Sequence, residues 1–179
     1  MAQYAYPDAD NTDGSWTDQD GGSSLYVAID DAWDSADAST YIKSPDDGMD
    51  DACIVRLSNV STPASGNAYI KYKAVAVDSM GGSAPSLKLE LLQDTTVKAT
   101  TTNNSVDTSS YTDYSYTISD VSAISDWTDL YMRITMVTNM GSGDLMLITQ
   151  VYLETQDAGG SSVPIAAIAM NTYKQLGNN

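Results

Sequence analysis

Several stretches of the chain alternate between apolar and polar residues. Leu87, Leu89 and Leu91 share one side of an extended segment, and the residues between them, Lys88 and Glu90, point to the other side. The segment 130–136 repeats this pattern, with Leu, Met and Ile at its even positions. Such a period of two predicts strands with one face in a core and one face in water.

The alternating stretches are short and are separated by turn residues, such as the Gly-Gly pair at 81–82 and Gly-Ser-Gly at 141–143. Connections of this length join neighbouring antiparallel strands. The pattern predicts an all-β, jelly-roll-like antiparallel sandwich of about eight strands, and a single helical turn at 30–37. The expected strands are 24–30, 40–44, 51–60, 68–78, 86–101 (with a break inside it), 111–118, 129–138 and 144–154.

A Gly/Ser hinge at 158–162 ends the predicted sandwich domain of residues 1–157 and begins a C-terminal extended arm, 163–179. Both faces of an extended 163–170 segment are apolar, and Pro164 favours an edge position because it cannot donate to a ladder. The arm either forms a ninth strand of its own domain or adds a strand to a neighbouring molecule. The residues expected to bind the partner are Val163, Pro164, Ile165, Ile168, Met170, Tyr173 and Leu176.

Composition favours the same fold class and excludes several functions. The chain has twelve Tyr and no Phe, and its net charge is −16, with thirteen Asp and one Lys in residues 1–51. Aromatic and β-branched residues suit a pleated sheet. A surface this acidic repels phosphate backbones and anionic membranes, so we expect neither nucleic acid nor membrane as a partner.

The inventory of reactive side chains argues against an enzyme. The chain has no His, which removes the usual triads and the commonest proton shuttle. Cys53 lies in an apolar run and is expected to be a buried thiol. No apolar run is long enough to span a membrane, and the N-terminus lacks the pattern of a signal peptide, so synthesis in a cytoplasm without export is expected.

Two acidic clusters, at residues 8–14 and 46–51, could bind calcium. Asp8, Asp10 and Asp13 occupy relative positions one, three and six, with Gly14 at seven, whereas an EF-hand loop needs ligands at one, three and five with Gly at six. The EF-hand interpretation therefore fails. Calcium held by sandwich loops stays open as the only cofactor hypothesis, beside the simpler interpretation that these Asp residues form turns.

The tryptophans also allow two interpretations. Trp16, Trp33 and Trp127 could offer flat platforms to a sugar, or Trp33 and Trp127 could close the ends of the sandwich core. The tyrosines of the segment 111–116 could form a contact patch or one face of an amphipathic strand.

Several segments in order resemble a jelly-roll domain of structural proteins from tailed bacteriophages. The similarity spans roughly residues 4–155. The segments that carry it are Tyr6-Pro-Asp-Ala-Asp10, Gly14-Ser-Trp16, Ser24-Leu-Tyr-Val-Ala-Ile-Asp-Asp31, Asp37-Ala-Ser-Thr-Tyr-Ile-Lys-Ser44, Cys53-Ile-Val-Arg-Leu57, Lys88-Leu-Glu-Leu-Leu-Gln-Asp-Thr-Thr-Val97 and Ile124-Ser-Asp-Trp-Thr-Asp-Leu-Tyr-Met-Arg133.

This resemblance implies a virion structural protein, a capsid decoration or cement protein that binds the assembled phage head and stabilises it. It implies a location on the capsid surface after synthesis in the host cytoplasm, and as partners the major capsid protein and other copies of the chain in a homo-oligomer. It implies no catalytic residues. The alternatives are a carbohydrate-binding module and a receptor-binding tail or fibre component, because related sandwiches serve those functions as well.

Overall fold

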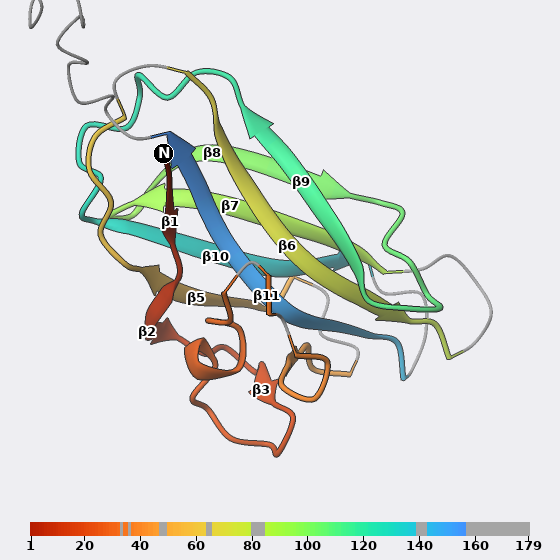
Figure 1. Cartoon of the computed structure of the whole chain (residues 1–179). Coiled ribbons are helices and arrows are strands. Elements are labelled where there is room, and N and C mark those ends of the chain that lie inside the picture. Colours follow the sequence, from red (N-terminus) through yellow and green to blue (C-terminus); the bar gives the residue numbers. More distant parts are fainter. Residues whose placement is uncertain are drawn as a thin grey trace, which may run out of the picture.

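The computed structural model describes residues 1–32, 34–35, 37–46, 50–63, 66–79, 85–138 and 143–156. Within them the chain forms eleven strands and one short 3₁₀ helix, and the strands lie in two antiparallel sheets packed face to face (Figure 1). The elements are β1 (Ala2–Ala5), β2 (Pro7–Thr12), β3 (Thr17–Asp18), η1 (Tyr26–Ala28), β4 (Ile42–Lys43), β5 (Ala52–Leu57), β6 (Ala68–Val77), β7 (Ser86–Gln93), β8 (Thr96–Asn103), β9 (Thr112–Ile118), β10 (Leu130–Thr138) and β11 (Leu145–Gln156).

The strand order is that of a jelly roll. The front sheet in Figure 1 runs β3-β4-β11-β6-β9, with β1 also paired to β11, and the back sheet runs β2-β5-β10-β7-β8. From β4 to β11 the chain visits the sheets in the order front, back, front, back, back, front, back, front. This is the eight-strand, two-sheet jelly-roll arrangement. The predicted fold class is therefore confirmed.

The core lies between the sheets and follows the period-two pattern of the sequence. On β7, Leu87, Leu89 and Leu91 are at most 1% exposed, and on β10 Met132 and Ile134 are fully buried. β6 alternates strictly between buried and half-buried residues along all ten positions. One face of each long strand therefore packs in the core, and the other faces outward.

The segment 24–30 differs from its prediction, because it forms the 3₁₀ helix η1 rather than a strand. Leu25 and Ile29 on either side of the helix are both fully buried. The backbone N–H of Tyr26 donates to the Asp10 carboxylate at 2.8 Å, and Ala28 N–H donates to the Leu25 carbonyl at 3.1 Å. The apolar residues thus reach the core from a turn, which a strand-like composition did not reveal.

The predicted break within 86–101 is confirmed as the turn between β7 and β8. Asp94 has a φ of 54°, a left-handed conformation that Asp adopts more readily than most residues. The strands β1, β2 and β3 were not predicted. β2 contains two Asp residues and has two register shifts against β5. Its sequence therefore lacks the regular apolar alternation that predicts a strand.

Other predictions fall on residues outside the described ranges. The hinge 158–162 and the arm 163–179 lie there entirely, so the domain boundary and the arm stay predictions. The segment 30–37 lies there in part, and its described residues contain a turn in which Ser35 N–H donates to the Ala32 carbonyl at 2.9 Å. Over the described ranges, the structure has no helix long and apolar enough to cross a bilayer.

Candidate binding groove

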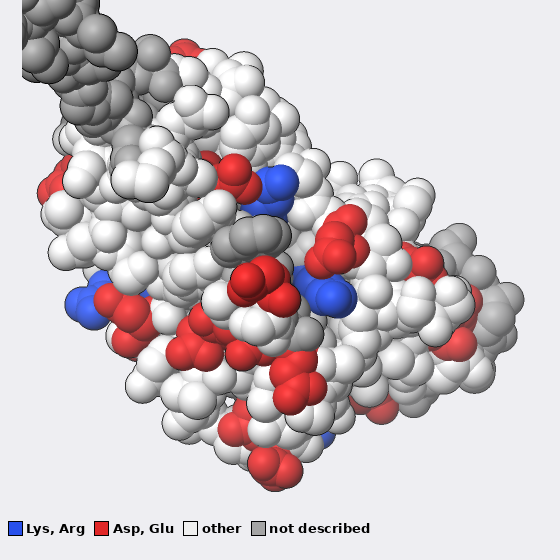
Figure 2. Space-filling model, in the orientation of Figure 1, with Lys and Arg blue, Asp and Glu red and all other residues white. Residues whose placement is uncertain are grey.

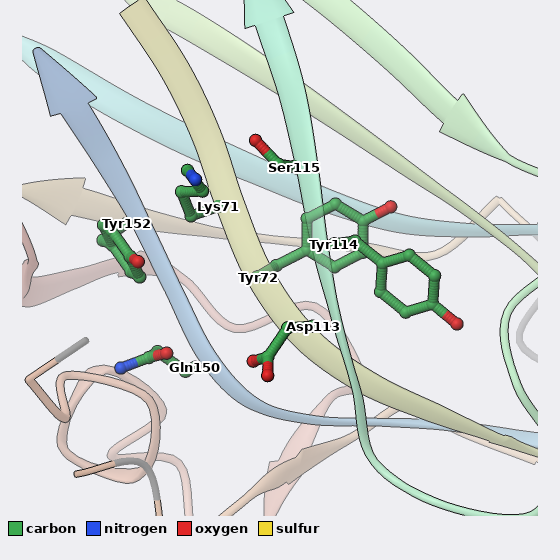
Figure 3. A pocket seen from close by; sticks show the side chains of 7 residues that line it. All are labelled: Lys71, Tyr72, Asp113, Tyr114, Ser115, Gln150 and Tyr152. Carbon is green, nitrogen blue, oxygen red and sulfur yellow. The ribbon is translucent and has the colours of Figure 1, made fainter. Parts of the chain in front are cut away.

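A groove lies on the outer face of the front sheet, over β11, β6 and β9 (Figure 3). Its volume is about 310 Å³. The ladders place its residues in rows across three strands: Ser115 pairs with Lys71, while Lys73 pairs with both Asp113 and Gln150. The lining residues are Lys71, Tyr72, Asp113, Tyr114, Ser115, Gln150 and Tyr152.

Tyr152 is the aromatic wall of the groove, and its ring is held by two other tyrosines. Its centroid lies 5.9 Å from that of Tyr4 in an edge-on arrangement and 5.4 Å from that of Tyr6. Burial, with a smaller effect from the Glu154 charge, raises the pKa of Tyr152 to about 12. The ring is therefore fixed in orientation, and its phenol keeps its proton at neutral pH.

Tyr72 and Tyr114 border the groove through the neighbouring strands β6 and β9, and their rings lie on the inner face of the sheet. Their rings stack at 5.0 Å with an interplanar angle of 20°. The Tyr114 hydroxyl accepts a hydrogen bond of 2.7 Å from the backbone N–H of Asp107. Burial raises the pKa of Tyr72. This stacked pair ties β6 to β9 beneath the groove and keeps its floor rigid.

Gln150 closes the other side of the groove at an irregularity of β11. The register of β11 against β6 shifts between Ile148 and Gln150. Gln150 is only 2% exposed, and its Nε2 donates to the carbonyls of Asp31 and Ala32, each at 2.7 Å. The backbone N–H of Val151 donates to the Ile29 carbonyl at 3.4 Å. The shift therefore joins β11 to the loop that follows η1.

The groove combines charges of both signs. Lys71 Nζ lies 3.6 Å from Glu154 Oε2 and 5.5 Å from the centroid of the Tyr69 ring. Asp113 is exposed on β9, next to Lys73 in the ladder. All seven Lys and Arg residues in the described ranges lie in strands. Acidic side chains gather instead over the lower region of Figure 2, where β2, β3 and η1 lie in Figure 1.

The three carboxylates proposed to hold calcium are not brought together, so this prediction is wrong. Asp8 accepts two hydrogen bonds from Arg56, at 2.7 and 2.9 Å, and Asp10 accepts from the backbone of Tyr26. No group of three potential metal-ligating side chains occurs in the described part of the chain, which includes Asp13. Register shifts of β2 against β5 next to Asp8 and Asp10 turn these side chains to different partners.

Asp residues do form turns elsewhere in the chain, at four loop positions outside the proposed calcium clusters. In each, an Asp carboxylate accepts hydrogen bonds from the backbone N–H and the hydroxyl of the Ser or Thr two residues later. These hydrogen bonds lower the pKa of each carboxyl. The four residues are Asp37, Asp107, Asp120 and Asp126.

The tryptophan platform is also wrong for two of its three residues. Trp16 is 1% exposed and Trp127 is 4% exposed, so neither presents a ring to solvent. Trp16 Nε1 donates to the Asp51 carbonyl at 3.2 Å, which satisfies its polar atom inside the protein. Core packing, the alternative interpretation, is therefore confirmed for Trp127, and Trp16 lies in the core as well. Trp33 lies outside the described residues.

A smaller cavity of about 200 Å³ lies on the outer face of the back sheet. Its lining residues are Asn11, Ile54, Leu92, Asp94, Thr95, Tyr131 and Arg133. Arg133 Nε donates to Glu90 at 2.7 Å, so this guanidinium is already paired. Because this cavity lies on the opposite sheet, a substitution of one of its residues serves as a control for substitutions in the larger groove.

The groove was not predicted from the sequence. Lys71 and Ser115 could have been assigned to outward faces by alternation, but the pairing of β6 with β9 and β11 is not visible in any one segment. Gln150 and Tyr152 lie in a strand that is buried on both faces over much of its length. Within 111–116, Tyr114 and Tyr116 alternate with the exposed Asp113 and Ser115 and pack against the core, so the interpretation as one face of an amphipathic strand is confirmed.

Comparison with known proteins finds no matching family model and no matching curated protein. Similar solved structures include the xylan-binding module CBM15, which is 10% identical, with 88% of this chain and 99% of that chain covered and a TM-score of 0.48. The CBM22-1 xylan-binding domain from Paenibacillus barcinonensis Xyn10C is 12% identical, with 89% and 95% covered and a TM-score of 0.45. A CBM4 structure is 16% identical, with 67% and 74% covered and a TM-score of 0.46. All three TM-scores lie below 0.5, so the jelly-roll assignment rests on the strand order of this chain.

Proposed function

We propose that this protein is a carbohydrate-binding module and that its ligand occupies the groove over β11, β6 and β9. The observation that supports this proposal most directly is the lining of the groove. An orienting aromatic ring and several polar side chains meet in one concavity on a rigid sheet. Binding sites for small ligands commonly combine these features.

The chemistry of the lining suits a sugar. A sugar ring has apolar C–H faces and a rim of hydroxyl groups. Tyr152 is 7% exposed, so only a small part of its ring can contact a sugar, while Lys71 and Ser115 can donate hydrogen bonds and Asp113 and Gln150 can accept them. Donors and acceptors in one site match hydroxyl groups, which do both.

The proposed role is binding without catalysis. Hydrolysis of a glycosidic bond commonly requires two carboxyl groups placed on either side of it. Among the described residues that line the groove, Asp113 is the only one with a carboxylate. The chain also contains no His to act as a proton shuttle.

The proposal is tested by calorimetric titration of the full chain with soluble hexasaccharides of β-1,4-linked glucose, xylose and mannose. We expect at least one of them to bind, and we expect Asp113→Asn and Lys71→Met to weaken its binding about tenfold or more, since each removes a charge-assisted hydrogen bond. Asp94→Asn is the matched control, because Asn also tolerates the left-handed conformation at that turn.

Two results would contradict the proposal. If none of the oligosaccharides binds, the groove is not a site for these sugars. If Asp94→Asn weakens binding while Asp113→Asn does not, the ligand occupies the cavity of the back sheet, which Asp94 lines.

The second candidate, a capsid decoration protein, rests on the phage resemblance of residues 4–155 and stays a prediction. The jelly-roll strand order is consistent with it, because capsid and lectin domains both use this fold. A receptor-binding component of a virion would unite the two candidates. Co-sedimentation of the full chain with assembled phage heads tests the decoration role, and a chain that stays in the supernatant would contradict it.

A further inference from the structure

We infer that Gln150 makes the groove selective for sugars with free hydroxyl groups, and that O-alkylated or O-acylated forms of the same sugars are rejected. This inference rests on the proposed function and names the class of ligand that the groove takes. It follows from the hydrogen bonds that Gln150 already makes inside the protein.

Both amide hydrogens of Gln150 are in use. A side-chain amide has two N–H donors and one carbonyl acceptor. Nε2 donates to Asp31 O and to Ala32 O, each at 2.7 Å. A flipped amide would place its oxygen against these two carbonyl oxygens. The orientation is therefore fixed, and only Oε1 remains for a ligand.

The oxygen of Gln150 faces the groove. Figure 3 shows Oε1 on the side of the amide that points toward Asp113, with Nε2 directed away from it. Within the described ranges, Oε1 accepts no hydrogen bond from the protein. Gln150 is 2% exposed, so few water molecules can reach this oxygen once a ligand covers the groove.

Asp113 provides a second acceptor across the groove. Asp113 and Gln150 both pair with Lys73 on β6, so they lie two strands apart. Their Cα atoms are therefore separated by about 10 Å, twice the spacing of neighbouring strands, and Lys73 stands between them on the same outer face, so a ligand that reaches both acceptors lies over Lys73. An ionised carboxylate accepts hydrogen bonds and donates none. The ligand must therefore bring donors to both sides.

A hydroxyl group meets this requirement, and an ether or an ester does not. When a buried acceptor loses its donor, the cost of removing it from water is no longer compensated. Sites built to bond a hydroxyl group reject the analogue that lacks it far more strongly than apolar pockets reject a missing methylene. The groove is partly open, so we expect a preference for the free sugar of about tenfold or more rather than the largest values known.

The experiment compares two ligands on the same protein. The full chain is titrated with the best-binding hexasaccharide of the neutral panel and with its O-methylated form, and the ratio of the two dissociation constants is measured. The same ratio is measured for Asp113→Asn, which adds a donor, and for Gln150→Met, which keeps the length of the side chain and removes the acceptor. Asp94→Asn is the control.

The ratio separates recognition from structural support. Gln150→Met also loses the bonds to Asp31 and Ala32, so it can weaken both ligands through the loop. Only loss of the acceptor brings the ratio toward one. We expect the ratio to fall in Gln150→Met and Asp113→Asn and to stay unchanged in Asp94→Asn.

Three other outcomes would contradict either the inference or the proposed function. If the free and O-methylated sugars bind the parent protein equally, the inference is wrong and the proposed function stands. If the ratio is large in the parent and unchanged in Gln150→Met, another residue makes the selection and the inference is again wrong. If no sugar of the panel binds, the proposed function fails, and the inference fails with it.

Discussion

Arg133 and Glu90 are direct partners across β10 and β7, and Arg133 Nε donates to Glu90 Oε2 at 2.7 Å on the outer face of the back sheet. Glu90 is only 7% exposed, so its carboxylate depends on this bond and on Lys88 Nζ at 3.4 Å. Arg133→Met should lower the free energy of unfolding by about 1–3 kcal/mol, because a mostly buried acceptor loses its donor. Urea unfolding measures this loss.

The control for this prediction is Arg56→Met, which makes the same chemical change at an exposed pair. The side chains of Arg56 and Asp8 are 49% and 34% exposed, so water replaces the lost bond there. Equal losses in the two variants would show that burial of Glu90 does not strengthen its ion pair.

Stability should fall at acidic pH. The hydrogen bond from Arg133 lowers the pKa of Glu90 in the folded state. A carboxyl whose folded pKa is lower than its unfolded pKa stabilises the protein above the unfolded value, about 4.3 for Glu, and this stabilisation is lost as the pH falls through the folded value. The melting temperature should therefore decrease steadily below about pH 5.

The four turn-forming Asp residues act in the same direction, because their pKa values are also lowered. Asp10 acts in the opposite direction, since burial raises its pKa. Glu90→Gln should flatten the acidic part of the curve relative to the parent. A parallel curve for this variant would assign the acid sensitivity to the loop carboxylates.

Trp16 and Trp127 should contribute to stability and not to sugar binding. Replacing a buried aromatic side chain by Ala costs about 3–5 kcal/mol, and both rings are in the core. Trp16→Ala should therefore unfold at lower urea concentration, and Trp16→Phe should retain part of the stability. The fraction that stays folded should bind the panel sugar with unchanged affinity. A selective loss of affinity in stable Trp127→Phe would return this residue to the ligand site.

Cys53 should be unreactive in the native protein. It is fully buried on β5, and burial raises the pKa of its thiol, while the reactive form is the thiolate. An aromatic disulfide reagent should label it slowly in buffer and completely in denaturant. Fast labelling of the native state would indicate that β5 opens frequently.

The fold was largely predictable because its signal is local. Leu87, Leu89 and Leu91 need only their own alternation to indicate a core face, and the structure buries all three. η1 was missed because Leu25 and Ile29 are buried from a turn, where no period applies. Composition alone does not separate these two ways of burying an apolar side chain.

The groove was not predictable because it depends on which strands become neighbours. Ser115 on β9 and Tyr152 on β11 are separated by β6 in the sheet and by many residues in the chain. In the sequence, Gln150 interrupts an apolar strand. Its hydrogen bonds to the carbonyls of Asp31 and Ala32 join residues far apart in the chain and are visible only in the folded structure. The Trp residues attracted the prediction instead because they are large and few.

The predicted arm 163–179 can be separated from the sugar site by a chain that ends at Gln156. β11 is complete in that chain: Gln156 pairs with Ala2, and Leu153 is fully buried. We expect the shortened chain to fold and to bind the panel sugar as the parent does.

The arm hypothesis predicts two losses in the shortened chain. If the arm binds other copies of the chain, the mass of the free protein should fall to that of a monomer. If it binds the capsid, sedimentation with phage heads should be lost. Light scattering after size-exclusion chromatography measures the first effect. Ile165→Asp with Ile168→Asp in the full chain is the matched control, because it keeps the length and removes the apolar surface. An unchanged oligomer and unchanged sedimentation in both proteins would contradict the arm hypothesis and leave the groove as the binding surface to pursue.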